Sequence, residues 1–264
     1  MTTVIESKQN TTLRHLARLA RDKKYRRGTG DMVCEGEKLL YEALHSGAAV
    51  KTVLLCAGTD FGAAARDLIA KAETQGARLF EAAPALFAQA SDVETPQGVV
   101  FSCAQPHRMA DELPRDLNGA VLLDGVQDPG NLGTILRTAD AFALDAVILC
   151  EGCADPSAPK VVRATMGAAF RQPVYRMPLE EAAAVLRDRG LPLYAAALEP
   201  DSVPCTSLDL HSAAVVIGSE GRGVSARTLE LCNRKLIIPM AGRAESLNAG
   251  VAASILIWEM TKGA

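Results

Sequence analysis

Hydrophobic positions in the first part of the chain alternate between the period of a helix and that of a buried strand. A first helix is predicted after Asn10 or Thr11, either of which can cap it, with a break at residues 26–30. Its apolar side is formed by Leu13, Leu16, Ala17, Leu19 and Ala20. Strands are predicted at residues 32–35, 52–56, 79–80 and 98–103, and helices at 37–45 and 61–74. This alternation predicts a smaller α/β domain over residues 1–105.

The second half of the chain repeats the alternation with stronger strands. Strands are predicted at residues 120–124, 146–150, 193–197, 213–218 and 235–239. These runs are continuously apolar, which is typical of a parallel sheet covered by helices on both faces. Ligands bind such sheets beyond the carboxyl ends of the strands. We therefore expect a second α/β domain at residues 118–264, joined to the first by a linker at 106–117 that contains Pro106 and Pro114.

Positive charge is concentrated at the N-terminus. The chain has 264 residues and a net charge of −3, with 48% hydrophobic and 22% charged residues, as in an ordinary globular protein. Residues 1–27 hold eight basic and two acidic side chains, a charge of +6, which leaves 20 basic and 29 acidic side chains, or −9, in the rest. Such a segment can contact nucleic-acid phosphates, and a solvated helix face is the alternative. The candidate phosphate contacts are Arg14, Arg18, Lys23, Lys24, Arg26 and Arg27.

Several other classes of protein are disfavoured. No apolar run reaches the roughly 18 residues of a membrane helix, and residues 1–27 lack the apolar core of a signal peptide, so a cytoplasmic protein is expected. The seven cysteines are odd in number and scattered, which argues against a disulfide framework. Cys150 and Cys153 have the spacing of metal ligands but no second pair, so we expect no metal and interpret them as a strand end followed by a turn. The four histidines lie in no zinc or hydrolase motif.

Residues 131–137, Asn-Leu-Gly-Thr-Ile-Leu-Arg, follow the strand that ends at Asp124. Asn131 can cap a helix there. The predicted buried face of that helix is Ile135, Leu136, Ala139 and Phe142. Arg137 lies off this face and is expected to point toward solvent or a cleft. Its structural alternative is an ion pair with Asp140, three residues further on.

Residues 217–223, Ile-Gly-Ser-Glu-Gly-Arg-Gly, form a turn after another predicted strand. Exposed backbone N–H groups in such a turn can bind a nucleoside or an anion. The glycine spacing is the reverse of the dinucleotide fingerprint, and no acidic residue is set at the end of a second strand to bind a ribose. Both features disfavour a nicotinamide-dependent oxidoreductase. A tight turn before a helix capped by Ser225 explains the glycines but does not explain Glu220 within the turn.

Residues 237–242, Ile-Ile-Pro-Met-Ala-Gly, lead into Ser246, Leu247 and Asn248. Ser246 is predicted to begin a helix that is apolar on nearly every side as far as Met260, which indicates burial in a core or in an oligomer interface. A buried Asn248 in this helix would need hydrogen-bond partners, which a ligand or a crossing loop can supply. Between these motifs, the basic residues of segment 159–171 are candidate phosphate contacts or the edge of a solvated helix. They are Lys160, Arg163 and Arg171.

In this order and spacing, the three motifs resemble the signature motifs of the SpoU family of RNA ribose 2′-O-methyltransferases, which use S-adenosylmethionine. The resemblance implies that residues 118–264 form the catalytic domain of the SPOUT superfamily, with a parallel sheet and a deep trefoil knot, and that the protein is a homodimer through this domain. Residues 35–36, Glu-Gly, and 95–99, Thr-Pro-Gln-Gly-Val, make the N-terminal part similar to the substrate-binding domain of that family, which certain ribosomal proteins share. The implied partner is RNA, and 23S ribosomal RNA is the expected substrate.

The resemblance also implies roles for individual residues. Contacts to S-adenosylmethionine are expected from Gly218, Ile238 and Leu247, and the implied catalytic group is Asn131, Arg137, Glu220, Ser246 and Asn248. Because a guanidinium stays protonated, we expect Arg137 to stabilise a developing alkoxide and to hold phosphate rather than to act as a simple base. Residues 249–251, Ala-Gly-Val, depart from the Val-Ser-Val of many members, a change that could reshape the cofactor floor or the dimer contact.

Other functions remain as alternatives to a 23S rRNA methyltransferase. A tRNA 2′-O-methyltransferase and a methyltransferase that protects the ribosome from an antibiotic would carry the same motifs. A catalytically silent RNA-binding relative is a further class, and the intact Asn131, Arg137, Glu220 and Asn248 argue against it.

Overall fold

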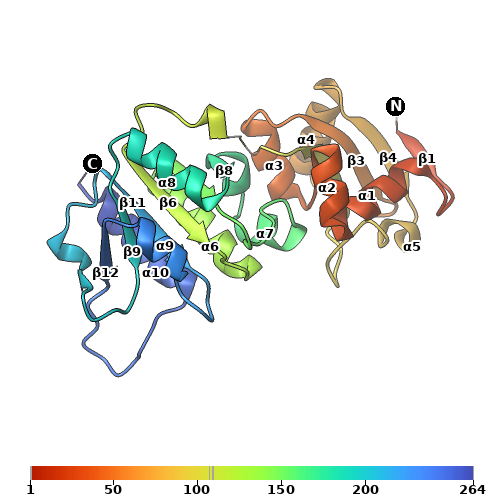
Figure 1. Ribbon diagram of the computed structural model, residues 1–264. Coiled ribbons are helices and arrows are strands. Elements are labelled where there is room, and N and C mark those ends of the chain that lie inside the picture. Colours follow the sequence, from red (N-terminus) through yellow and green to blue (C-terminus); the bar gives the residue numbers. More distant parts are fainter. Residues whose placement is uncertain (1, 107, 109, 264) are drawn as a thin grey trace. The chain divides into compact units, whose positions relative to one another are not determined.

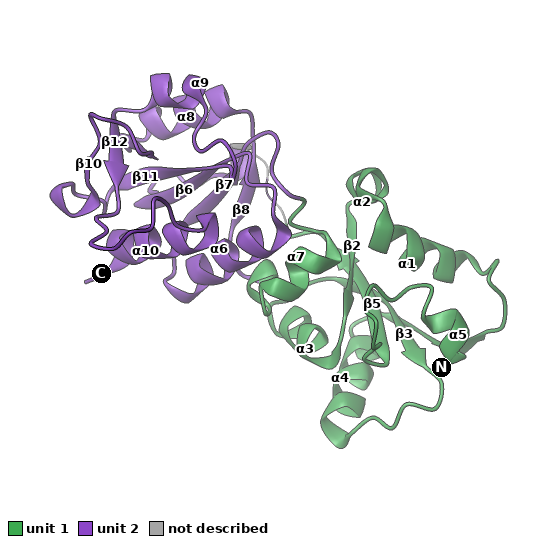
Figure 2. Ribbon diagram, turned by 90° about the horizontal axis from the view of Figure 1, so that it is seen from below, with its two compact units in different colours: residues 1–106, 155–170 green, residues 107–154, 171–264 purple. Residues whose placement is uncertain are grey.

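The computed structural model describes residues 2–106, 108 and 110–263, which form two compact units (Figures 1 and 2). The first unit comprises residues 1–106 and 155–170, and the second comprises residues 107–154 and 171–264. His107 and Met109 of the predicted linker lie outside the described residues. The division falls at the start of that linker, and one segment of the second half of the chain belongs to the first unit.

A five-stranded mixed sheet forms the centre of the first unit, in the order β1-β4-β3-β5-β2. The strands are β1 (Thr3–Ile5), β2 (Asp31–Glu35), β3 (Val50–Cys56), β4 (Arg78–Ala82) and β5 (Val99–Ala104). β4 is parallel to β1 and β3, whereas β5 runs antiparallel to β2 and β3. The helices are α1 (Thr11–Arg21), α2 (Lys23–Thr29), α3 (Glu37–His45), α4 (Ala63–Thr74), α5 (Pro84–Phe87), α7 (Pro159–Ala164) and the 3₁₀ helix η2 (Ala168–Phe170).

Helices cover both faces of this sheet, because successive strand side chains point to opposite faces. On β2, Met32 and Cys34 pack with residues of α3 and α4. Val33, between them, packs with residues of α1 and α5. The arrangement confirms the strands and helices predicted for this part of the chain.

The N-terminal helical segment differs from its prediction in one respect. Asn10 caps α1 as expected, with its side-chain oxygen accepting from the backbone N–H groups of Thr12 and Leu13 at 2.9 and 3.2 Å. The helical segment does end within the predicted break at residues 26–30, but a further break at Asp22 divides it into two helices. The Asp22 side chain accepts from the Tyr25 N–H at 3.0 Å and starts α2, which ends at Gly30 in the left-handed conformation.

The second unit contains a seven-stranded sheet in the order β10-β12-β9-β11-β6-β7-β8. Its strands are β6 (Gly119–Asp124), β7 (Ala146–Leu149), β8 (Val174–Arg176), β9 (Leu193–Ala196), β10 (Val203–Pro204), β11 (Ala213–Gly218) and β12 (Arg234–Ile237). Its helices are α6 (Pro129–Ala141), α8 (Leu179–Asp188), α9 (Ala226–Leu231) and α10 (Ala249–Thr261), with short 3₁₀ helices η1 (Ala110–Glu112) and η3 (Cys205–Ser207). The described neighbouring strands all pair in parallel, as the continuous apolar runs predicted.

Helices α8 and α9 cover one face of the parallel sheet, and α6 and α10 cover the other (Figure 2). Leu113 and Leu117, from the predicted linker, are buried in the core beneath α8. The described end of the linker is therefore part of the second unit. None of the helices in residues 2–106, 108 and 110–263 has both the length and the apolar character needed to span a membrane.

Residues 155–170 fold with the first unit, although the sequence pattern assigns them to the second domain. Val162, Ala169 and Phe170 are buried in the core that α3 and α4 share with the sheet, and α7 lies against β2. The pattern of strands and helices along the chain can only assign a segment to the domain that precedes and follows it in sequence. Burial of these three apolar side chains places this segment in the first unit instead.

Candidate cofactor and catalytic site

A cavity of about 390 Å³ lies beyond the carboxyl ends of β9, β11 and β12, within the size range of small-molecule sites. It is lined by residues 196–199, 217–220, 222–224, 229, 236–238, 240, 246, 247, 249 and 252. All three predicted cofactor residues, Gly218, Ile238 and Leu247, are among them, together with Glu220 and Ser246. Two of the three sequence motifs therefore form the wall of one cavity.

Gly218 ends β11 where two backbone segments come very close. A Cβ atom on Gly218 would lie 2.0 Å from the carbonyl carbon of Gly223 and 2.1 Å from the nitrogen of Val224. The turn between them is closed by two hydrogen bonds of 2.9 Å between the backbones of Ser219 and Gly223. The absence of a side chain at Gly218 is thus a steric requirement of this turn.

Glu220, which a simple turn did not explain, joins the second motif to the first. One carboxylate oxygen accepts from the Asn131 side-chain amide at 2.8 Å and from the Asp128 N–H at 3.2 Å, and the other accepts from the Gln127 N–H at 3.3 Å. Partial burial by itself raises the pKa of Glu220, but the hydrogen bonds from Asn131 and from backbone N–H groups outweigh it and lower the pKa. The carboxylate is therefore held ionised against the start of α6.

Helix α6 begins earlier than predicted. Asp128, and not Asn131, is its N-cap, and the Asp128 side chain accepts from the Asn131 N–H at 2.8 Å. Asn131 is buried in the first turn of α6. Because it does not cap the helix, its side-chain amide can donate a hydrogen bond to Glu220. The expected buried face is found except for Phe142, which is 37% exposed and stacks edge-on against Trp258 with ring centroids 5.2 Å apart.

Arg137 is exposed on α6, off the buried face, as its position in the helix predicted. Its suggested partner Asp140 pairs with Arg171 instead, at 2.7 Å. Within the described part of the chain, Arg137 makes no hydrogen bond or ion pair, and it is not among the residues that line the cavity. Its guanidinium is available to a ligand that approaches from solvent.

The third motif is positioned differently from its prediction. The last helix, α10, begins at Ala249 and not at Ser246, because Asn248 is its N-cap and accepts from the N–H groups of Gly250 and Val251 at 2.9 and 3.2 Å. Asn248 is exposed rather than buried, and so is Ser246. The side-chain oxygens of Asn248 and Asn131 both lie close to Gly250, where a Cβ would meet them at 3.2 and 3.3 Å. The first and third motifs therefore meet at Gly250.

The sequence motifs missed one wall of the cavity. Ala197, Leu198 and Glu199, just past the end of β9, line it together with Met240. The available signal was the sheet itself, because β9 was predicted as a strand and ligands bind beyond strand ends. Pro200 and Asp201 mark a turn after that strand, but none of the three motifs includes it.

Most of the predicted N-terminal phosphate contacts form an exposed basic surface on α1 and α2. The exposed members are Arg14, Arg18, Lys23, Lys24 and Arg27. The apolar side of α1 faces the core, which leaves its charged side in solvent. Arg18 lies over the ring of Tyr25, with its guanidinium carbon 4.2 Å from the ring centre.

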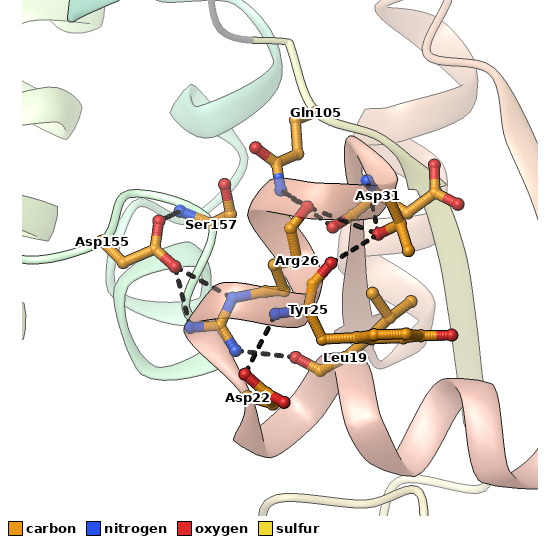
Figure 3. A network of polar contacts seen from close by, with 9 residues as sticks. Leu19, Asp22, Tyr25, Arg26, Asp31, Gln105, Asp155 and Ser157 are labelled. Atoms are coloured by element: carbon orange, nitrogen blue, oxygen red, sulfur yellow. Dashed lines mark hydrogen bonds and ion pairs between the residues drawn. The ribbon is translucent and has the colours of Figure 1, made fainter.

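Arg26 is a correction to this set, because it is only 4% exposed (Figure 3). Its guanidinium donates to one carboxylate oxygen of Asp155 at 2.9 and 2.8 Å and to the Leu19 carbonyl at 2.7 Å. Both members of the ion pair are buried in the first unit. Arg26 therefore holds the segment that begins at Asp155 and is not available to bind RNA.

The three basic residues of segment 159–171 are not equivalent. Lys160 is exposed, and Arg163 is partly buried and pairs with Asp92 at 3.1 Å, both in the first unit. Arg171 belongs to the second unit, where it pairs with Asp140. Of these three residues, only Lys160 has no ion pair within the described part of the chain.

In the described part of the chain, no three His, Cys, Asp or Glu side chains come together in an arrangement that could hold a metal ion. Burial raises the pKa of both Cys150 and Cys153, which keeps their thiols protonated. The Cys153 thiol donates to the Leu123 carbonyl at 3.2 Å. The pair follows β7 as a strand end and turn.

Comparison with known proteins agrees with this arrangement. The SpoU rRNA Methylase family matches residues 118–258, and an MRM3-like substrate binding domain matches residues 10–100. A 23S rRNA (guanosine(2553)-2′-O)-methyltransferase, RlmP of Bacillus subtilis, is 37% identical over 97% of this chain and 98% of its own length.

Two solved structures share the fold over nearly the whole chain. An rRNA methyltransferase from Sinorhizobium meliloti with bound AdoMet has a TM-score of 0.87 and 30% identity, covering 98% of this chain and 97% of its own. The SpoU methyltransferase AviRb from Streptomyces viridochromogenes, in complex with the cofactor AdoMet, has a TM-score of 0.83 and 28% identity, covering 96% and 98%. The expected fold class, enzyme class and cofactor are thereby confirmed. The chain belongs to the SpoU rRNA Methylase family of S-adenosylmethionine-dependent RNA 2′-O-methyltransferases.

Proposed function

We propose that this protein transfers a methyl group from S-adenosylmethionine to a ribose 2′-hydroxyl of 23S ribosomal RNA. The observation that carries the proposal is the cavity beyond β9, β11 and β12. Gly218, Ile238 and Leu247 all line this cavity. The turn at Gly218 has no space for a side chain, because the backbone of Gly223 and Val224 fills that space, and this tight turn forms part of the cavity wall. The B. subtilis relative, which matches over nearly the whole chain, is named for 23S rRNA and supports that RNA over tRNA.

Bound S-adenosylmethionine would supply an electrophilic methyl group on a sulfonium sulfur. Gly218, Ile238 and Leu247 would hold the cofactor, chiefly through backbone groups, and the apolar side of the cavity would exclude water. Glu220 fixes the loop before α6 and orients Asn131. This leaves Ser246 and Asn248, exposed at the cavity's edge and at the start of α10, to contact RNA.

Arg137 is the group we assign to the attacking ribose. In the transfer, the 2′-oxygen would bond to the methyl carbon, the bond from that carbon to the sulfonium sulfur would break, and the hydroxyl proton would pass to solvent. An exposed guanidinium without a protein partner can donate hydrogen bonds to a phosphate and to the 2′-oxygen as it loses that proton. A fixed fork of donors suits this task better than a flexible ammonium. Arg137 therefore acts by orientation and charge stabilisation.

Replacing Arg137 by alanine should lower kcat for methylation of 23S rRNA by about 100-fold or more, the usual effect of removing one donor to a developing oxyanion. Affinity for S-adenosylhomocysteine and the thermal unfolding midpoint should stay unchanged, because Arg137 is exposed and does not line the cavity. Transfer of labelled methyl groups to purified 23S rRNA and tRNA measures the activity and its target, with the guanosine named for the B. subtilis relative as the first position to map.

Near-normal turnover of Arg137→Lys would contradict a specific role for the guanidinium. Methylation of tRNA alone would overturn the assignment of the RNA while leaving the reaction intact. If neither RNA accepted a methyl group, the chain would instead behave as a silent RNA-binding relative.

Contacts to RNA are proposed for the exposed basic residues of the first unit, which is the part that matches a substrate-binding domain. They are Arg14, Arg18, Lys23, Lys24, Arg27 and Lys160, of which Arg18 forms only a loose, exposed ion pair with Asp22 at 3.6 Å. Arg163 and Arg171 would first have to leave their carboxylate partners, so we place them second. The cytoplasm is the proposed compartment, since the cysteines of the described residues are free thiols, as in a reducing environment.

A homodimer through the second unit is the proposed assembly. Val251 and Trp258 of α10 and Phe142, just past the end of α6, are 45%, 50% and 37% exposed, which makes an apolar surface on two helices that pack together. Large aromatic side chains are typical anchors of protein interfaces. A two-fold axis would let this surface pair with its own copy.

Replacing Trp258 by glutamate should convert the dimer to a monomer in light scattering at micromolar concentration, because a charge would be buried at the contact. Tyr41→Glu, at a 47% exposed aromatic residue of the first unit, is the matched control and should leave the dimer intact. A monomeric unsubstituted protein, or equal masses for the two variants, would contradict this assembly.

A further inference from the structure

Glu199 is an acidic residue in the part of the cavity wall that lies outside the three sequence motifs. Glu199 lies three residues past the end of β9, and β9 pairs in parallel with β11, which ends at Gly218. Glu199 and Gly218 both line the cavity. The sequence pattern had indicated that no acidic residue ends a strand beside the glycine turn. The sheet order corrects this, because β9 is the neighbour of β11 although about twenty residues separate their ends in the chain.

The turn that carries Glu199 is held by its own hydrogen bonds. The Glu199 N–H donates to the Ser202 hydroxyl oxygen at 3.2 Å, and the same hydroxyl donates to the Ala197 carbonyl at 2.7 Å. These contacts fix the backbone of the cavity wall before any ligand binds. A site whose wall is preformed loses less conformational entropy on binding.

The carboxylate of Glu199 keeps most of its capacity to accept hydrogen bonds. Lys235 is the nearby cation, and its ammonium lies 3.0 Å from Asp201 but 3.9 Å from Glu199. The shorter contact is a hydrogen bond, whereas the longer one is only an electrostatic interaction. Lys235 therefore holds Asp201 and leaves the oxygens of Glu199 available.

We infer that Glu199 accepts hydrogen bonds from the ribose hydroxyls of the adenosine part of S-adenosylmethionine. A carboxylate accepts from both hydroxyls of a ribose, and parallel α/β folds that bind dinucleotides place such an acid beyond the strand next to their glycine turn. The same placement arises here from a different strand order and with the reverse glycine spacing. Apolar residues on the same cavity, Leu236 and Ile237 among them, suit the adenine ring. The inference rests on the use of S-adenosylmethionine and is independent of which RNA is methylated.

Binding of two ligands to the full-length protein tests this role. S-adenosylhomocysteine carries the adenosine and the amino-acid part, whereas methylthioadenosine keeps the ribose and lacks the amino acid. Glu199→Ala should weaken binding of both ligands by about tenfold or more, as expected for loss of a hydrogen bond to a charged group. Glu199→Gln should lose less, since its amide oxygen can still accept one hydrogen bond.

Asp201→Asn is the matched control, because Asp201 binds the same lysine but does not line the cavity. It should bind both ligands as the unsubstituted protein does, and all variants should keep their thermal unfolding midpoint. Unchanged binding by Glu199→Ala would overturn the inference. A loss of affinity confined to S-adenosylhomocysteine would also overturn it, because Glu199 would then contact the ligand's ammonium group. An equal loss of affinity in Asp201→Asn would overturn it as well.

Failure of the inference can be told apart from failure of the proposed function. If the unsubstituted protein bound neither ligand, both would be wrong. If Glu199→Ala weakened both ligands while 23S rRNA accepted no methyl group, the ribose contact would stand and only the RNA assignment would fall.

Discussion

Replacing Gly218 by alanine should abolish binding of S-adenosylhomocysteine and lower the free energy of unfolding of the second unit by about 3 kcal/mol, the upper end for overpacking. The new Cβ would lie 2.0 Å from the Gly223 carbonyl carbon and 2.1 Å from the Val224 nitrogen. Both are backbone atoms, so no side-chain rotation can make room. Calorimetric titration with S-adenosylhomocysteine and urea unfolding measure the two effects.

Gly221→Ala is the control in the same turn, because a Cβ there would meet no atom within 4 Å. It should keep both ligand affinity and stability close to those of the unsubstituted protein. Equal affinities of the two variants for S-adenosylhomocysteine would show that the turn at Gly218 does not shape the cofactor cavity.

Breaking the ion pair between Arg26 and Asp155 should lower the free energy of unfolding of the first unit by about 3–5 kcal/mol, because the remaining charge would stay buried without a partner. The two side chains are each only 5% exposed. Arg26→Met and Asp155→Asn remove the charges one at a time, and urea unfolding measures the loss. The double variant Arg26→Met/Asp155→Leu should recover most of the stability, since an apolar pair of similar volume has no desolvation cost.

An exposed ion pair provides the comparison. Arg227→Met breaks the contact with Glu180, in which both side chains are more than half exposed, and should cost about 1 kcal/mol or less. If Arg26→Met cost no more than Arg227→Met, the buried pair would not be what holds residues 155–170 in place. Unchanged RNA affinity in the double variant would also fit a structural role for Arg26.

The elements of the fold could be predicted well from local pattern. Continuous apolar runs identified the long strands of the second sheet. On β2 every residue is buried, and its side chains alternate between the two cores because of the two-residue period of a strand. Cap positions were harder, because several polar residues in a row can each begin a helix. Asp128 occupies the cap that the pattern gave to Asn131, and Asn248 caps the helix that the pattern began at Ser246.

Part of the candidate site could be predicted from local turns at strand ends. Glycine and polar residues at strand ends marked Gly218, Glu220 and Asn131, because a turn with no room for a side chain and a carboxylate in a tight loop both leave a local signal. Glu199 left none. Its place in the cavity depends on β9 lying beside β11, which is a property of the whole sheet.

The sequence by itself determined the longer strands and most of the helices, the family, the cofactor and the basic N-terminal segment, since each of these depends on residues that are neighbours in the chain. Only the tertiary structure decided that Arg26 is buried with Asp155, that residues 155–170 belong to the first unit, and that Glu199 lines the same cavity as Gly218. In each case the partner is distant in sequence, and the choice between solvent, ligand and core is made by packing between those distant segments.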